Sequence, residues 1–258
     1  MTRFAYRAGA AAMGGQLKSP FTQPLEVQAA SFLTNVGGYG SARVENFRFK
    51  EIVSFKAGYS QVIGIEREQG GTTIRETLAS AVVEGLNILD MVTADRVVAR
   101  LTSETPSTAT PTDELRILPF GSYFENLRIA GQLIEITPHP HLLDKAAATK
   151  TGLQNTSAGL LFDPDASAPT NFIVLPVTST LRCSLFKSPK VAGTTALIPG
   201  ATTGPGWRIE IPSFGAIYLG EYVVTGGHRQ LTMLRVELHS PEEGRIVFAT
   251  VEGNGSAY

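Results

Sequence analysis

The chain has 258 residues, of which 43% are hydrophobic, and a formal net charge of −1 from 22 basic and 23 acidic side chains. Nucleic-acid-binding proteins usually carry a basic stripe, and no run of either sign occurs here, so no nucleic-acid partner is expected. No stretch approaches 18 uninterrupted apolar residues, which excludes a membrane-spanning helix, and the single cysteine excludes an intrachain disulfide.

The N-terminal segment, Thr2 to Leu17, predicts a strand. Its apolar or small residues alternate on one face: Phe4, Tyr6, Ala8, Ala10 and Ala12. Its glycines would let another backbone approach closely, so we expect it to lie against a sheet edge of its own chain or of a neighbouring subunit. The segment is not a clear signal peptide, and we expect a protein that is cytoplasmic or exported without one.

Three similar segments occur about 40 residues apart, at 44–49, 83–88 and 124–129, and a weaker copy spans 217–223. This spacing is typical of structural repeats. Each of the three segments has a glutamate followed by a residue that tolerates positive φ. The glutamates are Glu45, Glu84 and Glu125, and the residues after them are Asn46, Gly85 and Asn126.

In an unbroken strand each of these glutamates would share a face with the apolar residues that follow it, which is costly for an ionised group. A β-bulge after the glutamate would remove the conflict by shifting the alternation by one residue. We therefore predict bulges at Asn46, Gly85 and Asn126. The glutamates would then face solvent, and the residues before them would be buried: Val44, Val83 and Phe124.

The glutamates at equivalent positions could form an acidic row across neighbouring strands. A pair of carboxylates about 5 Å apart would suit a retaining glycoside hydrolase. The structural alternative is ion pairing with nearby arginines, namely Arg43, Arg48 and Arg128.

The remaining elements also favour strands. Long strands are predicted at 52–68, 73–83 and 91–101, with a hairpin at Gly70-Gly71, and later strands at 172–176, 180–187, 207–211, 216–224, 230–238 and 244–251. Residues 102–113 and 149–171 are predicted as loops, and 142–148 as the single short helix. The sequence thus predicts an all-β fold, an antiparallel sandwich or meander of repeated strand–bulge–strand units. Its two regions, 1–150 and 151–258, would pack as one globular unit.

Few residues suggest chemistry. His139 and His141 could share a metal, and Asp163 to Ser167 is similar to the start of a calcium loop but lacks its glycine and closing glutamate. Cys183 lies in an alternating strand pattern typical of a buried thiol. Trp207 and several tyrosines could stack on sugars or pack in the core. No catalytic residue, metal or cofactor is predicted, and the core is large enough to fold without one.

Residues 80–95 resemble two groups of proteins. One is a set of uncharacterised bacterial proteins with the same style of sequence along most of the chain. The other is the choice-of-anchor group of bacterial surface β proteins, similar over this motif only. The resemblance implies a bacterial β protein that forms assemblies, and it transfers no catalytic residue.

Three functions remain open. The leading hypothesis is a non-enzymatic structural protein that self-assembles as a homo-oligomer into a filament, sheath or shell, because β units repeat and catalytic residue types are few. The alternatives are a β-sandwich module that binds carbohydrate or another small ligand, and a glycoside hydrolase-like enzyme.

Overall fold

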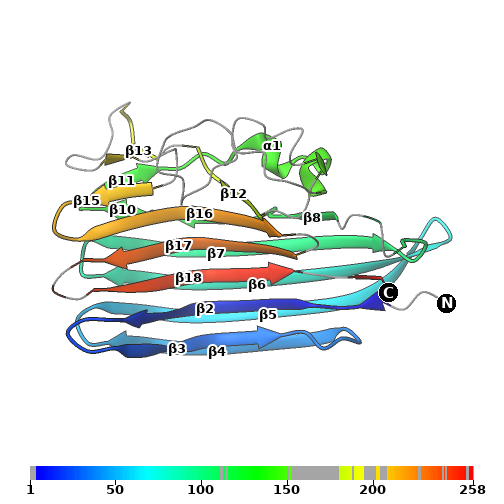
Figure 1. The fold of residues 1–258 in the computed structure, drawn as a ribbon, viewed down its shortest axis with the longest axis horizontal. Helices are drawn as coiled ribbons and strands as arrows, with labels where there is room; N and C mark the ends of the chain where they lie inside the picture. The colour runs from blue at the N-terminus through cyan, green and yellow to red at the C-terminus, as the bar shows by residue number, and fades with distance from the viewer. Residues whose placement is uncertain are drawn as a thin grey trace.

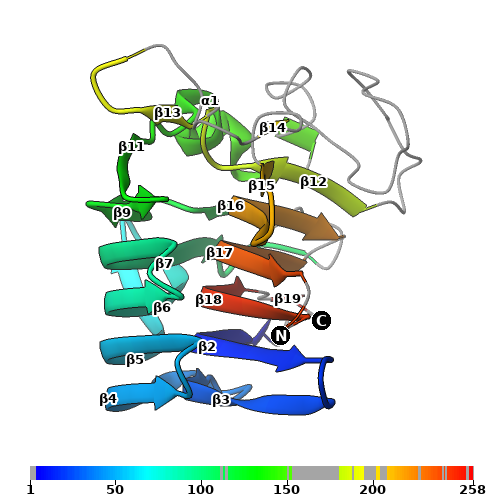
Figure 2. The same ribbon diagram turned by 90° about the vertical axis from the view of Figure 1, so that its left-hand side faces the viewer.

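The fold is a sandwich of two antiparallel β-sheets, as seen in a computed structural model of the chain. The structure describes residues 4–110, 113, 116–149, 151–152, 180–187, 189–194, 202–203, 208–225, 228–239, 241, 243–253 and 256–257. The prediction of an all-β fold is confirmed. In Figure 1 the two sheets lie one behind the other, and Figure 2 shows them side by side as two layers. Within the described residues, no helix has the length and apolar composition needed to cross a membrane.

The first sheet has nine strands, in the order β13-β11-β10-β7-β6-β5-β4, with β8 and β9 also paired to β7. Most of it is a meander of long neighbouring strands. Its members are β4 (Gly38–Phe49), β5 (Val53–Gln69), β6 (Thr72–Ile88), β7 (Val92–Pro106), β8 (Arg116–Leu118), β9 (Tyr123–Glu125), β10 (Arg128–Ile129), β11 (Gln132–Glu135) and β13 (Lys190–Val191).

The second sheet has eight strands, in the order β14-β15-β16-β17-β18-β2-β3, with β12 also paired to β16. It combines strands from near both ends of the sequence, because β2 pairs with β18. Its members are β2 (Ala8–Leu17), β3 (Gln23–Phe32), β12 (Thr180–Ser184), β14 (Thr202–Thr203), β15 (Arg208–Ile211), β16 (Gly215–Thr225), β17 (His228–Leu238) and β18 (Gly244–Gly253). A separate two-stranded ribbon pairs β1 (Phe4–Ala5) with β19 (Ser256–Ala257).

Two predicted elements differ from the structure. Thr102–Pro106 was predicted as loop but continues β7, because these residues pair with Ile74–Leu78 of β6. The predicted helix is divided into one α-helical turn, α1 (Pro140–Leu143), and a 3₁₀ turn, η1 (Lys145–Ala148). The predicted strand at 172–176 lies outside the described residues.

The N-terminal segment forms an inner strand rather than an edge addition. β2 pairs with β18 on one side and with β3 of its own chain on the other. Its glycines permit this close pairing, since a side chain at Gly15 would overlap the carbonyl oxygen of Arg245. Its small inward residues pack against the first sheet, where β2 contacts β5 and β6. The segment is thus part of its own sandwich.

In the nine-stranded sheet, two adjacent residues of β4, two of β6 and two at the end of β9 face outward along one row, which we call the outward crease. It contains Glu45–Asn46, Glu84–Gly85 and Glu125–Asn126, and φ is 51° at Asn46, 64° at Gly85 and 50° at Asn126. The flanking inward residues are buried at Val83 and half-buried at Val44 and Phe124. The register is unchanged across the row, so no residue is inserted. The predicted positive φ is present at all three positions, but the predicted bulges are in-register kinks.

The eight-stranded sheet has the opposite arrangement, an inward crease at which two adjacent side chains of each strand face the core. Its members are Ala12–Met13, Leu219–Gly220, Met233–Leu234 and Phe248–Ala249, and all except Gly220 are at most 1% exposed. Here φ is positive at Ala29, Gly220 and Ala249, with values of 47°, 65° and 48°. The inward crease was not predicted from the sequence.

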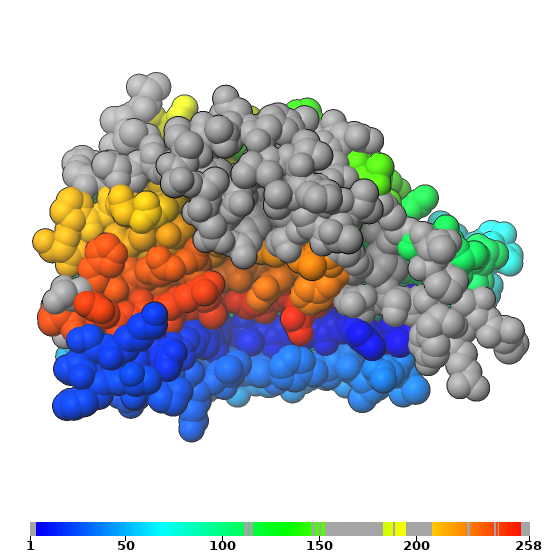
Figure 3. Space-filling model, in the orientation of Figure 1, coloured from blue at the N-terminus to red at the C-terminus, as the bar shows by residue number. Residues whose placement is uncertain are grey.

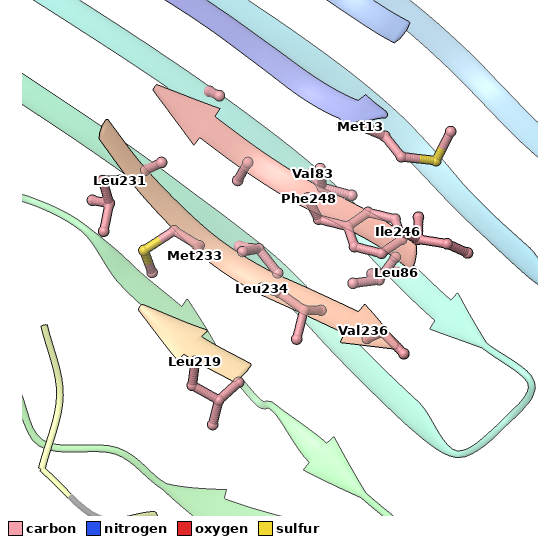
Figure 4. Packing of buried hydrophobic residues seen from close by; sticks show 14 of the residues in the cluster. Met13, Val83, Leu86, Leu219, Leu231, Met233, Leu234, Val236, Ile246 and Phe248 are labelled. Carbon is pink, nitrogen blue, oxygen red and sulfur yellow. The ribbon is translucent and has the colours of Figure 1, made fainter. Parts of the chain in front are cut away.

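The two creases pack against each other. A Cβ placed on Gly58, an inward residue beside the outward crease, would lie 2.9 Å from the Cβ of Ala12. Figure 4 shows the Phe248 ring next to Val83 and Leu86, which flank the outward crease in β6. β18 contacts β6 throughout this region. The doubled inward row of one sheet therefore fills the space left where the other sheet turns its side chains outward.

We predict that Gly85→Val lowers the free energy of unfolding by about 1–3 kcal/mol, because a β-branched residue is strained at positive φ. Gly85→Asn is the matched control, since Asn46 and Asn126 hold the same backbone conformation in the same row. Both new side chains meet Lys56, whose Cγ would lie 2.7 Å from the added Cβ, and that flexible chain can move. Urea unfolding measures the difference. Equal losses from the two variants would contradict the role of φ.

Candidate functional site

The predicted acidic row lies along the outward crease, on the exposed face of the nine-stranded sheet. The strand register places Glu45 opposite Ala57 and Ala57 opposite Glu84. Glu84 in turn is opposite Arg96, and Arg96 is opposite Glu125. The glutamates are therefore aligned, but each is two strands from the next, roughly 10 Å at ordinary strand spacing.

Arg96 is the cation in the middle of this row. Its Nη2 lies 2.8 Å from Oε1 of Glu84, and its Nε donates to the same oxygen at 3.1 Å. Hydrogen bonds to Tyr123 and Glu84, with the charge of Glu84, raise the pKa of Arg96. Tyr59 donates to Glu84 at 3.3 Å, and burial, followed by the Glu84 charge, raises the pKa of Tyr59. The Glu84 carboxylate is thus bonded by two neighbours, Arg96 and Tyr59.

The other two glutamates do not complete a catalytic pair. Glu45 is paired with Arg43 at 2.8 Å, as the structural alternative predicted, and both side chains are exposed. Arg48 pairs with Glu51 instead, and Arg128 bonds the carbonyl of Gly131. A retaining glycosidase needs carboxylates about 5 Å apart, whereas Arg96 separates Glu84 from Glu125. The row contains two surface ion pairs, Arg43–Glu45 and Arg96–Glu84, and such pairs are typically worth about 0–1 kcal/mol.

Among the residues that the structure describes, the predicted histidine pair belongs to no group of three possible metal ligands. Burial, followed by the charges of Lys187 and His141, lowers the pKa of His139. Its backbone N–H donates to the carbonyl of Leu185, which fixes the start of α1 on the chain before β13. No group of three histidine, cysteine or acidic side chains that could hold a metal occurs among the described residues. The segment Asp163–Ser167 and Trp207 lie outside them.

Cys183 is a buried thiol of the core. It is 2% exposed and lies 3.8 Å from the carbonyl oxygen of Tyr222. Burial raises its pKa to about 12, although the nearby Arg229 acts in the opposite direction. Since the thiolate is the reactive form, this cysteine is not a nucleophile.

One ionic cluster was missed by the sequence analysis. Arg235 of β17 is 6% exposed and bonds both Glu237 and Glu221, the latter at 2.8 Å through Nη2. Its guanidinium carbon lies 3.5 Å from the ring centroid of Tyr218. The available indication was an arginine and a glutamate two residues apart with apolar residues on either side, in Leu234-Arg235-Val236-Glu237-Leu238. Two carboxylates and a ring surround the one cation, and the cluster links β16 to β17.

Exposed apolar side chains occur along the segment before, within and after β3, where β3 and β4 end the two sheets on the lower side of Figures 1 and 2. Nine large hydrophobic side chains are exposed in the described part of the chain, and five of them lie between residues 21 and 39. We call this surface the β3–β4 side: Phe21, Val27, Phe32, Val36 and Tyr39, which are 59–89% exposed. The blue segment along the lower margin of Figure 3 is this part of the chain.

Comparison with known proteins gives a family but no activity. The family model described as a domain of unknown function, DUF8256, matches residues 4–160, more than half of the chain. The chain belongs to this family. No curated protein matches, and neither does any solved structure. These findings give no support to the resemblance of residues 80–95 to choice-of-anchor proteins.

The DUF8256 match covers the strands that carry the outward crease and the β3–β4 side. It includes β1 to β11 and ends before β12. The inward crease on β16, β17 and β18 therefore lies beyond the matched residues. In this DUF8256 protein the sandwich is completed by strands outside the region that defines the family.

We predict that Cys183 does not react with Ellman's reagent in the folded protein at pH 8. With a pKa of about 12, only on the order of one thiol in ten thousand is ionised at that pH. Unfolding in urea exposes the thiol and gives one equivalent of product, which serves as the control. Rapid stoichiometric labelling of the folded protein would show that the thiol is accessible.

Proposed function

We propose that the protein is a non-enzymatic structural subunit that self-assembles into a filament, sheath or shell, and that the β3–β4 side is one of its contact surfaces with a second copy. The observation that carries this proposal is that five of the nine exposed large hydrophobic side chains in the described residues lie on that side. Monomeric proteins rarely expose contiguous apolar patches, and such patches often mark interaction sites.

The ends of both sheets add to this surface. β3 and β4 each have one strand neighbour among the described residues, so each presents a free edge of backbone groups on the same side of the sandwich. A free edge is a ready template for another chain. Val36 lies in the connection between β3 and β4, and Tyr39 is the second residue of β4, which begins at Gly38.

Charge favours contact between identical copies. The net charge of −1 gives little mutual repulsion, and proteins near neutrality associate readily. The kinks limit where a second strand can add. Ala29 and Asn46 have positive φ within β3 and β4, and Pro24 removes a donor from β3. Contact is therefore expected at Val36, Tyr39 and the part of β4 before Asn46.

One such surface does not by itself make an extended assembly. A contact that uses the same patch on both copies gives a closed dimer, whereas a head-to-tail contact gives a ring or a fibre. The size of the assembly thus distinguishes the two geometries. Negative-stain images and light scattering on the purified protein report that size directly.

We predict that Val36→Glu and Tyr39→Glu each shift the protein towards a single 27.6 kDa chain in size-exclusion chromatography with light scattering. A charge placed in a desolvated contact opposes association. Phe120→Glu is the matched control, because Phe120 is as exposed as Tyr39, at 66%, but lies away from the β3–β4 side. We expect it to assemble like the wild type.

Thermal unfolding of all three variants checks that the fold is intact. A wild-type protein that stays a single chain at its highest soluble concentration would overturn the proposed function. An assembly that withstands both substitutions would instead place the contact on another surface.

A further inference from the structure

An open pocket of about 340 Å³ lies on the outer face of the eight-stranded sheet, at the end where β2 begins and β3 finishes. This volume is within the range of small-molecule sites. The residues that give it chemical character are Arg7, Phe32, Leu33, Asn35, His228 and Glu252. Phe32 belongs both to this pocket and to the β3–β4 side, whereas the other lining residues do not belong to that side.

Gly9 lies between two of the lining residues, Phe32 and Glu252. Phe32, Gly9 and Glu252 stand directly opposite one another on three neighbouring strands, β3, β2 and β18. A Cβ on Gly9 would lie 2.8 Å from Oε1 of Glu252 and 3.1 Å from Cδ1 of Phe32. The absence of a side chain at Gly9 therefore lets a carboxylate and an aromatic ring approach each other across it.

The two opposite charges of the pocket do not neutralise each other. Within the described residues Arg7 has no ion pair, and the ionic partner of Glu252 is His228, with 3.8 Å between Nε2 and Oε2. That distance is too long for a hydrogen bond. The pocket thus offers a guanidinium and a carboxylate whose hydrogen-bonding capacity is largely unused. Phe32 and Leu33 are apolar residues that line the same pocket.

We propose that this pocket binds a small zwitterion, an α-amino acid with an apolar side chain. The ligand carboxylate pairs with the guanidinium of Arg7, which matches carboxylate geometry. The ligand ammonium binds Glu252, next to the Phe32 ring, where a cation is also favoured. The apolar side chain packs on Phe32 and Leu33.

Isothermal titration calorimetry with two families of probes tests this assignment. The first family is leucine, 4-methylpentanoate, which lacks the ammonium, and isoamylamine, which lacks the carboxylate. The second is phenylalanine, 3-phenylpropionate and phenethylamine. We expect at least one amino acid to bind about tenfold or more tighter than either of its halves, since each charged hydrogen bond is worth that factor or more.

Two variants separate the charges. Arg7→Gln should reduce amino-acid affinity to that of the amine while leaving amine binding unchanged, and Glu252→Gln should do the reverse for the carboxylate probe. Arg245→Gln is the matched control, because Arg245 is an exposed arginine at the other end of β18 and does not line the pocket. We expect it to bind as the wild type does.

The titrations are repeated on Val36→Glu, so that contact between copies cannot hide the pocket. Absence of binding by both leucine and phenylalanine to wild type and Val36→Glu overturns the proposal. It is equally overturned if a carboxylate probe binds as tightly as its amino acid, which would make the pocket an anion site. Loss of affinity in Arg245→Gln as large as in Arg7→Gln would also overturn it, since binding would then lie elsewhere.

Discussion

An antiparallel sheet alternates its side chains between two faces, and this protein breaks that alternation once in each long strand of both sheets. The break turns two neighbours outward in one sheet and two neighbours inward in the other. Neither sheet could pack closely against a regularly alternating partner. The nine-stranded sheet would leave a gap in the core along its outward crease, and the eight-stranded sheet would place too many side chains in the core along its inward crease. The sandwich therefore depends on the two creases being opposite each other.

The same constraint explains which residues occupy the kinks. Asn46, Gly85 and Asn126 lie on the solvent side, where asparagine adopts positive φ at little cost and its amide reaches water or a neighbour, as Asn126 reaches Asp95 at 2.7 Å. Ala249 lies between the sheets at 0% exposure, where a longer side chain has no room. Alanine at positive φ costs roughly 1–2 kcal/mol, which close packing of the core must offset.

This contrast determines how much the sequence could reveal. The outward kinks leave a trace, because a glutamate out of phase with aromatic neighbours conflicts with burial. The inward kinks leave none, since alanine and methionine fit an apolar strand in either phase. Pairing between distant segments was also hidden. Thr102–Pro106 has the composition of a loop and is a strand only because β6 runs beside it, and Arg7 and Glu252 share a pocket only because β2 lies next to β18.

The position of β2 has a consequence for biosynthesis. Ala10 is synthesised about 240 residues before its strand partner Val251. At a synthesis rate of about 5–20 residues per second, β2 is exposed for tens of seconds before β18 is available to pair with it. During that time an aromatic or β-branched strand would be prone to join other nascent chains. The run of alanine and glycine in β2 has few large apolar or β-branched side chains through which it could pair with other nascent chains. The segment can therefore remain unpaired on the ribosome without aggregating until β18 emerges.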